Sequence, residues 1–173
     1  RCTSDRFGAT APNPAVGCAL LEAEGRVLTV GVHPRAGQPH AEAMALAQAR
    51  AAGILDQARV ALVTLEPCNH TGRTPPCSEA LRNSPIQEVW IGAADPNPQA
   101  SGGADRLREE PGAKRVVMLA DRPDMADLAL DCQALLAPFA SRVVRHRPWI
   151  SVKQALDEHG SMVPPPGQKT FTS

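Results

Sequence analysis

Short apolar segments alternate with helix-forming segments along most of this sequence. Two apolar runs, at 16–22 and 26–33, are joined by the stretch Ala-Glu-Gly, which predicts a β-hairpin. Further elements are then expected in this order: a helix at 40–53, a strand at 58–65, a helix at 74–84, a strand at 87–93, a helical turn at 104–110, a strand at 113–119 and a helix at 124–139. Strands that alternate with helices after a hairpin predict a layered α/β domain with a mixed sheet.

The length predicts one domain of ordinary size, because 173 residues can bury a full core but are too few for two complete domains. The 18 basic and 18 acidic residues cancel, and the chain has no tyrosine and only 3 phenylalanines. Nucleic-acid strands favour basic grooves with stacking aromatics, and membranes favour basic surfaces, so neither is expected as a partner. An apolar run of roughly 18–20 residues and a signal-peptide pattern are both missing, which favours a cytoplasmic protein.

Two cysteines enclose a stiff, polar loop. Cys68 and Cys77 are separated by eight residues that include two prolines. In a reducing compartment, the odd number of cysteines favours free thiols or metal ligands over disulfides. Upstream, the tripeptide His-Ala-Glu supplies His40 and Glu42. One imidazole and two thiolates would leave a zinc ion one open position, as catalytic sites require. On spacing alone, the cysteines can equally be ordinary thiols and His40 a capping or core residue.

The predicted helix starts place these groups where negative charge is favoured. His40 and Glu42 fall in the first turn of the helix at 40–53. Thr74 is the predicted N-cap of the next helix, with a proline at its first position, so Cys77 also lies in a first turn. Unpaired N–H groups and the helix dipole favour a carboxylate there and lower the pKa of a thiol. Both helix starts therefore suit an anionic metal site.

The chemistry expected from such a site is hydrolytic deamination of an amino-substituted heterocycle. Zinc held by His40, Cys68 and Cys77 would lower the pKa of a water to about 7. Glu42 can take the proton from that water, pass it to a ring nitrogen and protonate the departing amine. A histidine, a glutamate and paired cysteines form the signature of zinc nucleobase deaminases.

Three stretches of the sequence resemble the deaminase domain of the bifunctional riboflavin-biosynthesis enzymes. They are PNPAVGCALLEAEGRVLTVGVHPRAGQPHAEAMAL, VTLEPCNHTGRTPPCSEAL and DPNP, and the resemblance covers most of residues 11–140. It implies a cytidine-deaminase-like three-layer α/β/α fold with a central mixed sheet of about five strands. It also implies one zinc ion per chain on His40, Cys68 and Cys77, with Glu42 as the proton shuttle. The implied substrate is 2,5-diamino-6-(5-phosphoribosylamino)pyrimidin-4(3H)-one, which would lose its 2-amino group as ammonia.

The resemblance further implies substrate contacts from polar side chains outside the metal set. Amide and carboxylate groups suit hydroxyl and amide edges, and an arginine suits a phosphate. The implied residues are Asn13, His33, His70, Arg73, Asp95 and Asn97. Glu66, in contrast, is expected to make structural hydrogen bonds, and the glycine pair at 102–103 lacks the spacing of a nucleotide-binding loop.

The end of the chain is expected to form a separate region. Residues 1–143 are assigned to the deaminase domain. Beyond residue 146, RPWISVKQAL and KTFTS resemble the opening of the reductase domain of the same enzymes, and this resemblance assigns 144–173 to a linker and the first strand of a reductase-like domain. Reductase activity is not expected from this chain alone, and NADP would be a cofactor only if a full reductase domain follows. The resemblance also implies a homo-oligomer.

Two other functions stay open from the sequence. A deaminase of nucleic acid or free nucleosides would share the zinc ligands and Glu42, although the neutral charge and the scarce aromatics disfavour a strand binder. A non-catalytic module would hold zinc only for its structure. The presence of Glu42 and the number of three protein ligands disfavour this second alternative.

Overall fold

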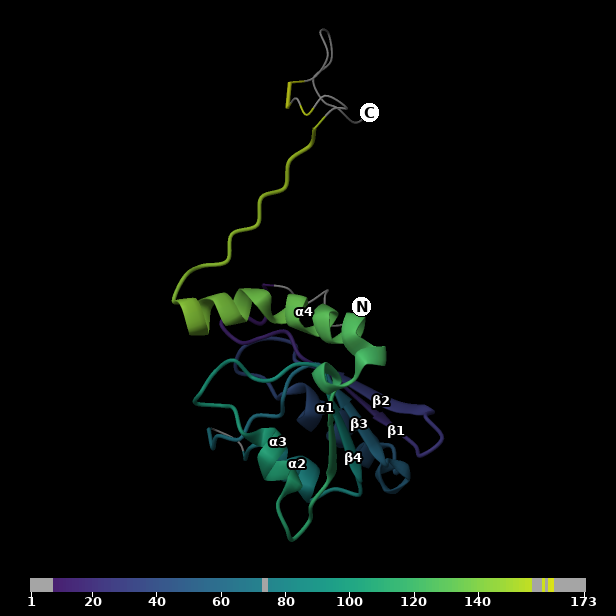
Figure 1. Cartoon of the computed structure of the whole chain (residues 1–173). Helices are drawn as coiled ribbons and strands as arrows, with labels where there is room; N and C mark the ends of the chain where they lie inside the picture. The colour runs from purple at the N-terminus through teal and green to yellow at the C-terminus, as the bar shows by residue number, and fades with distance from the viewer. Residues whose placement is uncertain (1–7, 73–74, 157–159, 161, 164–173) are drawn as a thin grey trace.

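The computed structural model describes residues 8–72, 75–156, 160 and 162–163. It has a five-stranded sheet and four α-helices (Figure 1). The strands are β1 (Gly17–Leu21), β2 (Val27–Val32), β3 (Val60–Val63), β4 (Glu88–Ile91) and β5 (Arg115–Met118). The α-helices are α1 (Ala41–Ala51), α2 (Cys77–Arg82), α3 (Gly103–Arg108) and α4 (Ala126–Arg145). Short 3-10 helices occur at η2 (Leu55–Gln57), η3 (Leu119–Asp121) and η4 (Pro123–Met125).

The sheet is mixed, as the sequence predicts. Its strand order is β2-β1-β3-β4-β5. The β1–β2 hairpin and the β1–β3 pair are antiparallel, whereas β3, β4 and β5 run parallel. Parallel neighbours need a crossover connection, and here the segments that contain α2 and α3 provide the two crossovers. The predicted α/β class and mixed sheet are confirmed.

The two faces of the sheet differ in their cover. The core lies on the face that packs against α1, α2 and α3, where Leu20, Val89 and Ile91 are fully buried. Since side chains alternate along a strand, Trp90 belongs to the opposite face. The guanidinium of Arg122, between η3 and η4, lies 5.5 Å from the centre of the Trp90 ring. The chain thus crosses to the second face after β5, and α4 then runs across the end of the sheet (Figure 1).

Helix α1 packs unusually close to β2. A Cβ atom at Gly31 would lie 2.1 Å from the backbone oxygen of Ala41 and 2.6 Å from the nitrogen of Ala45, so only glycine fits. At the other end, the N–H groups of Gly53 and Ile54 bond to carbonyls of the last turn, and Gly53 has a φ of 68°. This is a Schellman cap, which ends the helix at the glycine that the sequence marks. The close packing fixes the start of α1 against the sheet.

Helix α2 begins later than the sequence predicts. Its first residue is Cys77 and its N-cap is Pro76, with φ −56° and ψ 145°. The predicted N-cap, Thr74, lies outside the described residues, but the prediction that the helix includes Pro75 is wrong. A residue that precedes proline is disfavoured in the α region, so Pro76 keeps Pro75 out of the helix. As a result, Cys77 stands at the very first helical position.

Helix α4 is longer than predicted. It ends at Arg145 instead of 139, and Pro138 lies inside it. The buried side chains of Ala129, Cys132 and Leu136 hold it against the body of the domain. The strand expected in WISVKQAL is not formed, since residues 147–156 have no strand or helix in the structure. A single strand needs a pairing partner, and nothing among the described residues pairs with this segment.

Candidate functional site

Three metal-binding side chains meet where α1 and α2 begin. The Nδ1 atom of His40 lies 3.5 Å from Sγ of Cys68 and 3.4 Å from Sγ of Cys77. All three ligand atoms lie within 4.8 Å of one another. His40 is the N-cap of α1, Cys77 is the first residue of α2, and Cys68 follows β3. The structure therefore brings together the three residues that the sequence selects.

The spacing of these ligand atoms fits zinc. Tetrahedral zinc with Zn–S of about 2.3 Å and Zn–N of about 2.0–2.1 Å holds the nitrogen about 3.6 Å from each sulfur. The two N···S distances of 3.5 and 3.4 Å are close to that value. One imidazole and two sulfurs are also donors that zinc prefers. A set of three ligands leaves the fourth position to water or substrate, which is the arrangement of catalytic sites.

The pKa values of the two thiols shift in opposite directions. The Cys77 side chain hydrogen-bonds to the sulfur of Cys68 and lowers the pKa of the Cys68 thiol to about 4. The same hydrogen bond, together with burial, raises the pKa of the Cys77 thiol, so the lowered pKa that the sequence predicts for Cys77 at its helix start is wrong. The backbone N–H of Cys77 also donates to Sγ of Cys68 at 3.4 Å. Negative charge is thus concentrated on Cys68, which suits a cationic metal.

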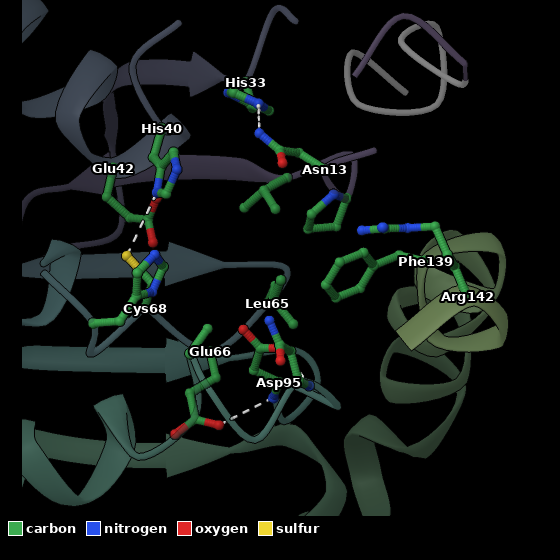
Figure 2. A pocket seen from close by; sticks show the side chains of 15 residues that line it. Asn13, His33, His40, Glu42, Leu65, Glu66, Cys68, Asp95, Phe139 and Arg142 are labelled. Atoms are coloured by element: carbon green, nitrogen blue, oxygen red, sulfur yellow. Dashed lines mark hydrogen bonds between the residues drawn. The ribbon is translucent and has the colours of Figure 1, made fainter. Parts of the chain in front are cut away.

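Glu42 lies beside the cluster, at the second position of α1. Its side chain is only 3% exposed. Burial, together with the nearby charge of Cys68, raises the pKa of the Glu42 carboxyl to about 7. Figure 2 shows the Glu42 side chain next to His40 and Cys68 on the same side of the pocket. A carboxyl group with a pKa near neutrality can both accept and release a proton, as acid–base catalysis requires.

The cluster opens into a pocket of about 300 Å³. This volume is at the lower end of the range for small-molecule sites. The pocket collects most of the side chains that the sequence selects for substrate contact, namely Asn13, His33, His70, Asp95 and Asn97. The remaining one, Arg73, lies outside the described residues. The individual substrate contacts of these residues stay predictions.

His33 and Asn13 hold each other in defined orientations. The ring nitrogen Nδ1 of His33 lies 3.0 Å from the carbonyl oxygen of Pro39, so it carries the proton and donates. Nε2 then accepts from the amide nitrogen of Asn13 at 3.2 Å (Figure 2). Burial lowers the pKa of His33, which keeps the ring neutral in this arrangement. The amide oxygen of Asn13 is thereby left to accept a hydrogen bond from a ligand.

Glu66 organises the loop that carries Asp95 and Asn97. One carboxylate oxygen accepts from the backbone N–H of Asp95 at 3.0 Å. The other accepts from the N–H groups of Gly102 at 3.0 Å and Ala104 at 2.9 Å. Within the loop, Asp95 Oδ1 accepts from the N–H of Asn97 at 2.8 Å. The structural role expected for Glu66 agrees with these three hydrogen bonds.

The glycine pair at 102–103 serves the packing of the same loop. Gly102 has a φ of 92°, in the left-handed region. A Cβ atom at Gly103 would lie 1.8 Å from the backbone oxygen of Pro67, the residue before Cys68. The pair thus allows the loop at 95–104 to approach the backbone next to a metal ligand.

Replacing Glu66 by glutamine is expected to lower the free energy of unfolding by about 1–3 kcal/mol. The amide has only one acceptor oxygen, so its NH₂ group would face at least one of the buried N–H donors and leave it unsatisfied. Thermal unfolding measures the effect, and Glu24→Gln, on an exposed turn, is the control, expected to stay within about 0.5 kcal/mol of wild type. Equal unfolding temperatures for both variants would show that the three hydrogen bonds do not stabilise the loop.

Among the pocket-lining residues that the sequence did not select, two come from α4. Phe139 and Arg142 line the pocket from α4. The helix was predicted to end at 139, so neither side chain was placed near the site. The spacing of Leu136, Ala140 and Val143 continues the apolar face of the helix past Pro138 and is the signal that extends it.

This chain matches one protein-family model and is similar to riboflavin biosynthesis proteins of plants. The model of the cytidine and deoxycytidylate deaminase zinc-binding region matches residues 3–93. The riboflavin biosynthesis protein PYRD of Zea mays, named as chloroplastic, is 55% identical over 102 residues, which are 58% of this chain and 25% of that protein. The Arabidopsis thaliana protein of the same name is 38% identical over 163 residues, which are 94% of this chain and 35% of that protein.

The fold of this chain is also similar to that of a solved structure. It is the diaminohydroxyphosphoribosylaminopyrimidine deaminase/5-amino-6-(5-phosphoribosylamino)uracil reductase of Thermotoga maritima, which is 35% identical with a TM-score of 0.75. The match covers 90% of this chain and 44% of that one. The matched part of this chain thus corresponds to 25%, 35% and 44% of the length of these three relatives, which is less than half in each case. Zinc, which the sequence predicts, agrees with the matched zinc-binding region and with the ligand cluster.

Among the described residues, no helix combines the length and the apolar character needed to cross a lipid bilayer.

Proposed function

Because this chain belongs to the family of the cytidine and deoxycytidylate deaminase zinc-binding region, we propose that it catalyses a zinc-dependent hydrolytic deamination. We propose 2,5-diamino-6-(5-phosphoribosylamino)pyrimidin-4(3H)-one, an intermediate of riboflavin biosynthesis, as the substrate. The observation that carries this proposal is the buried Glu42 beside His40, Cys68 and Cys77, at one end of a pocket. The names of the relatives, which are riboflavin biosynthesis proteins, support the choice of substrate.

The reaction exchanges the 2-amino group of the pyrimidine for oxygen. Water adds to the ring carbon, the carbon–nitrogen bond breaks, and ammonia leaves. Zinc, when bound, would supply a Lewis acid that makes water nucleophilic at neutral pH. The Glu42 carboxylate accepts a proton from the attacking water and delivers it to the ring nitrogen. It then takes the second proton of the added hydroxyl and transfers it to the amine, so no net proton is gained or lost.

The polar residues of the pocket would hold the substrate for this step. The amide oxygen of Asn13 can accept a hydrogen bond from the substrate, because one N–H of its NH₂ group is bound to His33 and fixes the orientation of the amide. Asp95 and Asn97 lie on the loop that Glu66 fixes, where they can bind hydroxyl or amide groups. His70 lines the same pocket and is a further contact. Orientation of this kind contributes to catalysis by holding the reacting carbon near the nucleophile.

An ammonia-release assay tests the function. Zinc-loaded protein is incubated separately with the phosphoribosylamino-pyrimidine, with cytidine and with a tRNA anticodon stem. We expect ammonia from the first compound only. Release from cytidine or the tRNA stem instead would replace the proposed substrate, and release from none with zinc bound would favour a structural zinc site.

The organisation of the longer protein is a further part of the proposal. We assign residues 1–143 to the deaminase domain and 144–173 to a linker and the start of a reductase-like domain, although α4 continues to Arg145. The relative from Thermotoga maritima is named as both deaminase and reductase. We expect no reductase activity from this chain alone, and NADP binding only with a full reductase domain. A homo-oligomer in the cytoplasm, with no nucleic-acid partner, stays a prediction.

A further inference from the structure

Two side chains of helix α4, Phe139 and Arg142, line the end of the pocket that lies opposite the metal ligands. Figure 2 shows His40, Glu42 and Cys68 on one side and Phe139 and Arg142 on the other. Both α4 side chains point from the helix toward the pocket, which they line. They stand outside residues 3–93, the part matched by the deaminase family model. The part of the chain that carries the ligands and Glu42 is therefore distinct from the part that closes the far end of the pocket.

Arg142 is an exposed residue whose guanidinium makes two contacts and keeps further donors. One of its terminal nitrogens donates to the carbonyl oxygen of Pro12 at 2.8 Å. Its central carbon lies 5.8 Å from the centre of the Phe139 ring, within the range of a cation–π contact. A guanidinium has five N–H donors in a planar fork, and the Pro12 carbonyl occupies only part of that capacity. Among the residues that the structure describes, no carboxylate forms an ion pair with Arg142.

Among the residues that the structure describes, the other ionisable groups that line the pocket do not supply a permanent positive charge. They are imidazoles and carboxylates, together with the Cys68 sulfur. Arg73, an implied substrate contact, lies outside the described residues. Within the described part of the chain, Arg142 is the one lining residue with a guanidinium or ammonium group. An anion that enters the pocket is therefore attracted to the α4 end. At the opposite end, Glu42 and the Cys68 sulfur would repel it, unless a metal cation balances them.

We propose that Arg142 binds the phosphate group of the substrate and selects phosphorylated over unphosphorylated compounds. This inference rests on the proposed function, in which the pyrimidine ring lies at the metal end and a ribose 5-phosphate arm extends from it. Such an arm carries its anionic group several bonds away from the reacting carbon. With the ring at the metal end, the far end of the pocket, where Arg142 stands, is open to this group. The fork of guanidinium donors suits two phosphate oxygens at once, and Phe139 and Pro12 orient it in advance.

Arg142→Gln tests the inference, because glutamine keeps a donor for the Pro12 carbonyl while removing the charge. Arg145→Gln, on an exposed residue of the last turn of the same helix that is not among the pocket-lining residues, is the matched control. Dissociation constants for ribose 5-phosphate, inorganic phosphate and ribose are measured by NMR titration. Specificity constants, kcat/KM, are measured for the phosphorylated pyrimidine and for its dephosphorylated riboside.

We expect Arg142→Gln to weaken ribose 5-phosphate binding and to lower kcat/KM for the phosphorylated pyrimidine, each by about 10- to 100-fold, the usual range for hydrogen bonds to charged groups. Ribose binding and kcat/KM for the riboside should stay unchanged, and Arg145→Gln should match wild type throughout. Arg142→Lys, which keeps the charge but not the fork, should fall between wild type and Arg142→Gln. Tighter binding of ribose 5-phosphate than of inorganic phosphate would show that the sugar phosphate, rather than any free anion, fits the pocket.

Equal losses for phosphorylated and unphosphorylated compounds would overturn the inference, because Arg142 would then only fasten α4 to the Pro12 segment. Unchanged binding in Arg142→Gln, or a wild type that does not prefer ribose 5-phosphate to ribose, would also overturn it. If wild type releases no ammonia from the pyrimidine but loses its phosphate preference on Arg142→Gln, the proposed function fails and the role of Arg142 stands.

Discussion

Replacing Glu42 by glutamine is expected to lower turnover by at least about a hundredfold while zinc content stays at the wild-type level. About a hundredfold is the lower end of the usual contribution of a general acid–base group to the rate. Glutamine has nearly the same shape as glutamate but cannot carry a proton between water, ring nitrogen and leaving amine. Because Glu42 is 3% exposed, a neutral amide there avoids the cost of a buried charge, so the variant should fold. Ammonia release and zinc content, measured on the same samples, check the two halves of this prediction.

A matched control separates catalysis from general damage. Glu24→Gln makes the same chemical change on an exposed turn and should leave both readings unchanged. Wild-type turnover in Glu42→Gln would remove Glu42 from the proton path. If the variant instead lost its zinc, Glu42 would be acting on the metal site and the proposed role would be wrong.

The order of elements could be predicted because local patterns and the sheet agree. The apolar runs joined by Ala-Glu-Gly form the β1–β2 hairpin, and the helix that starts near His40 ends at a Schellman glycine, Gly53. In these segments, hydrophobic periodicity and capping residues favour the same structure as the tertiary packing does. The local preference of the sequence is therefore kept in the fold. The order of strands in the sheet, with β1 between β2 and β3, came only from the structure.

Errors arose where a proline acts differently from its usual role. Pro75 was placed at the first position of α2, but Pro76 after it excludes the helical conformation, and the helix starts at Cys77. Pro138 lies inside α4, between the buried residues Leu136 and Ser141, and the helix continues past it to Arg145. A proline costs a helix one hydrogen bond, which burial of an apolar face can offset.

The candidate site was predictable to the extent that its residues have special chemistry. His40, Glu42 and the two cysteines could be selected because histidine and cysteine are the side chains that bind zinc, and a glutamate beside them can move protons. Phe139 and Arg142 are ordinary residues at the end of a helix, and no motif marks them. Their position in the pocket depends on how α4 lies across the sheet, which is a tertiary property.

Replacing Cys77 by serine is expected to weaken zinc binding by more than about a hundredfold. Loss of a residue that only supports a ligand costs about 10- to 100-fold in metal affinity, so loss of a direct ligand should cost more. A serine hydroxyl is a harder and far less acidic donor than a thiol, and zinc prefers the thiolate. The variant should also lose ammonia release, since His40 and Cys68 would remain as the only protein ligands of the cluster. Zinc retained after dialysis against a chelator of known affinity measures the change.

Cys132→Ser is the matched control for this change, because Cys132 is also a buried thiol but packs from α4 against Gly92 and is not part of the ligand cluster. The loss of a buried thiol can lower stability in either variant, so thermal unfolding in the presence of excess zinc is measured alongside. Zinc that binds only to the native state raises its stability, and this increment should disappear in Cys77→Ser but persist in Cys132→Ser. Full zinc occupancy and an unchanged increment in Cys77→Ser would exclude Cys77 as a ligand, and with it the three-residue site on which the hydrolytic chemistry depends.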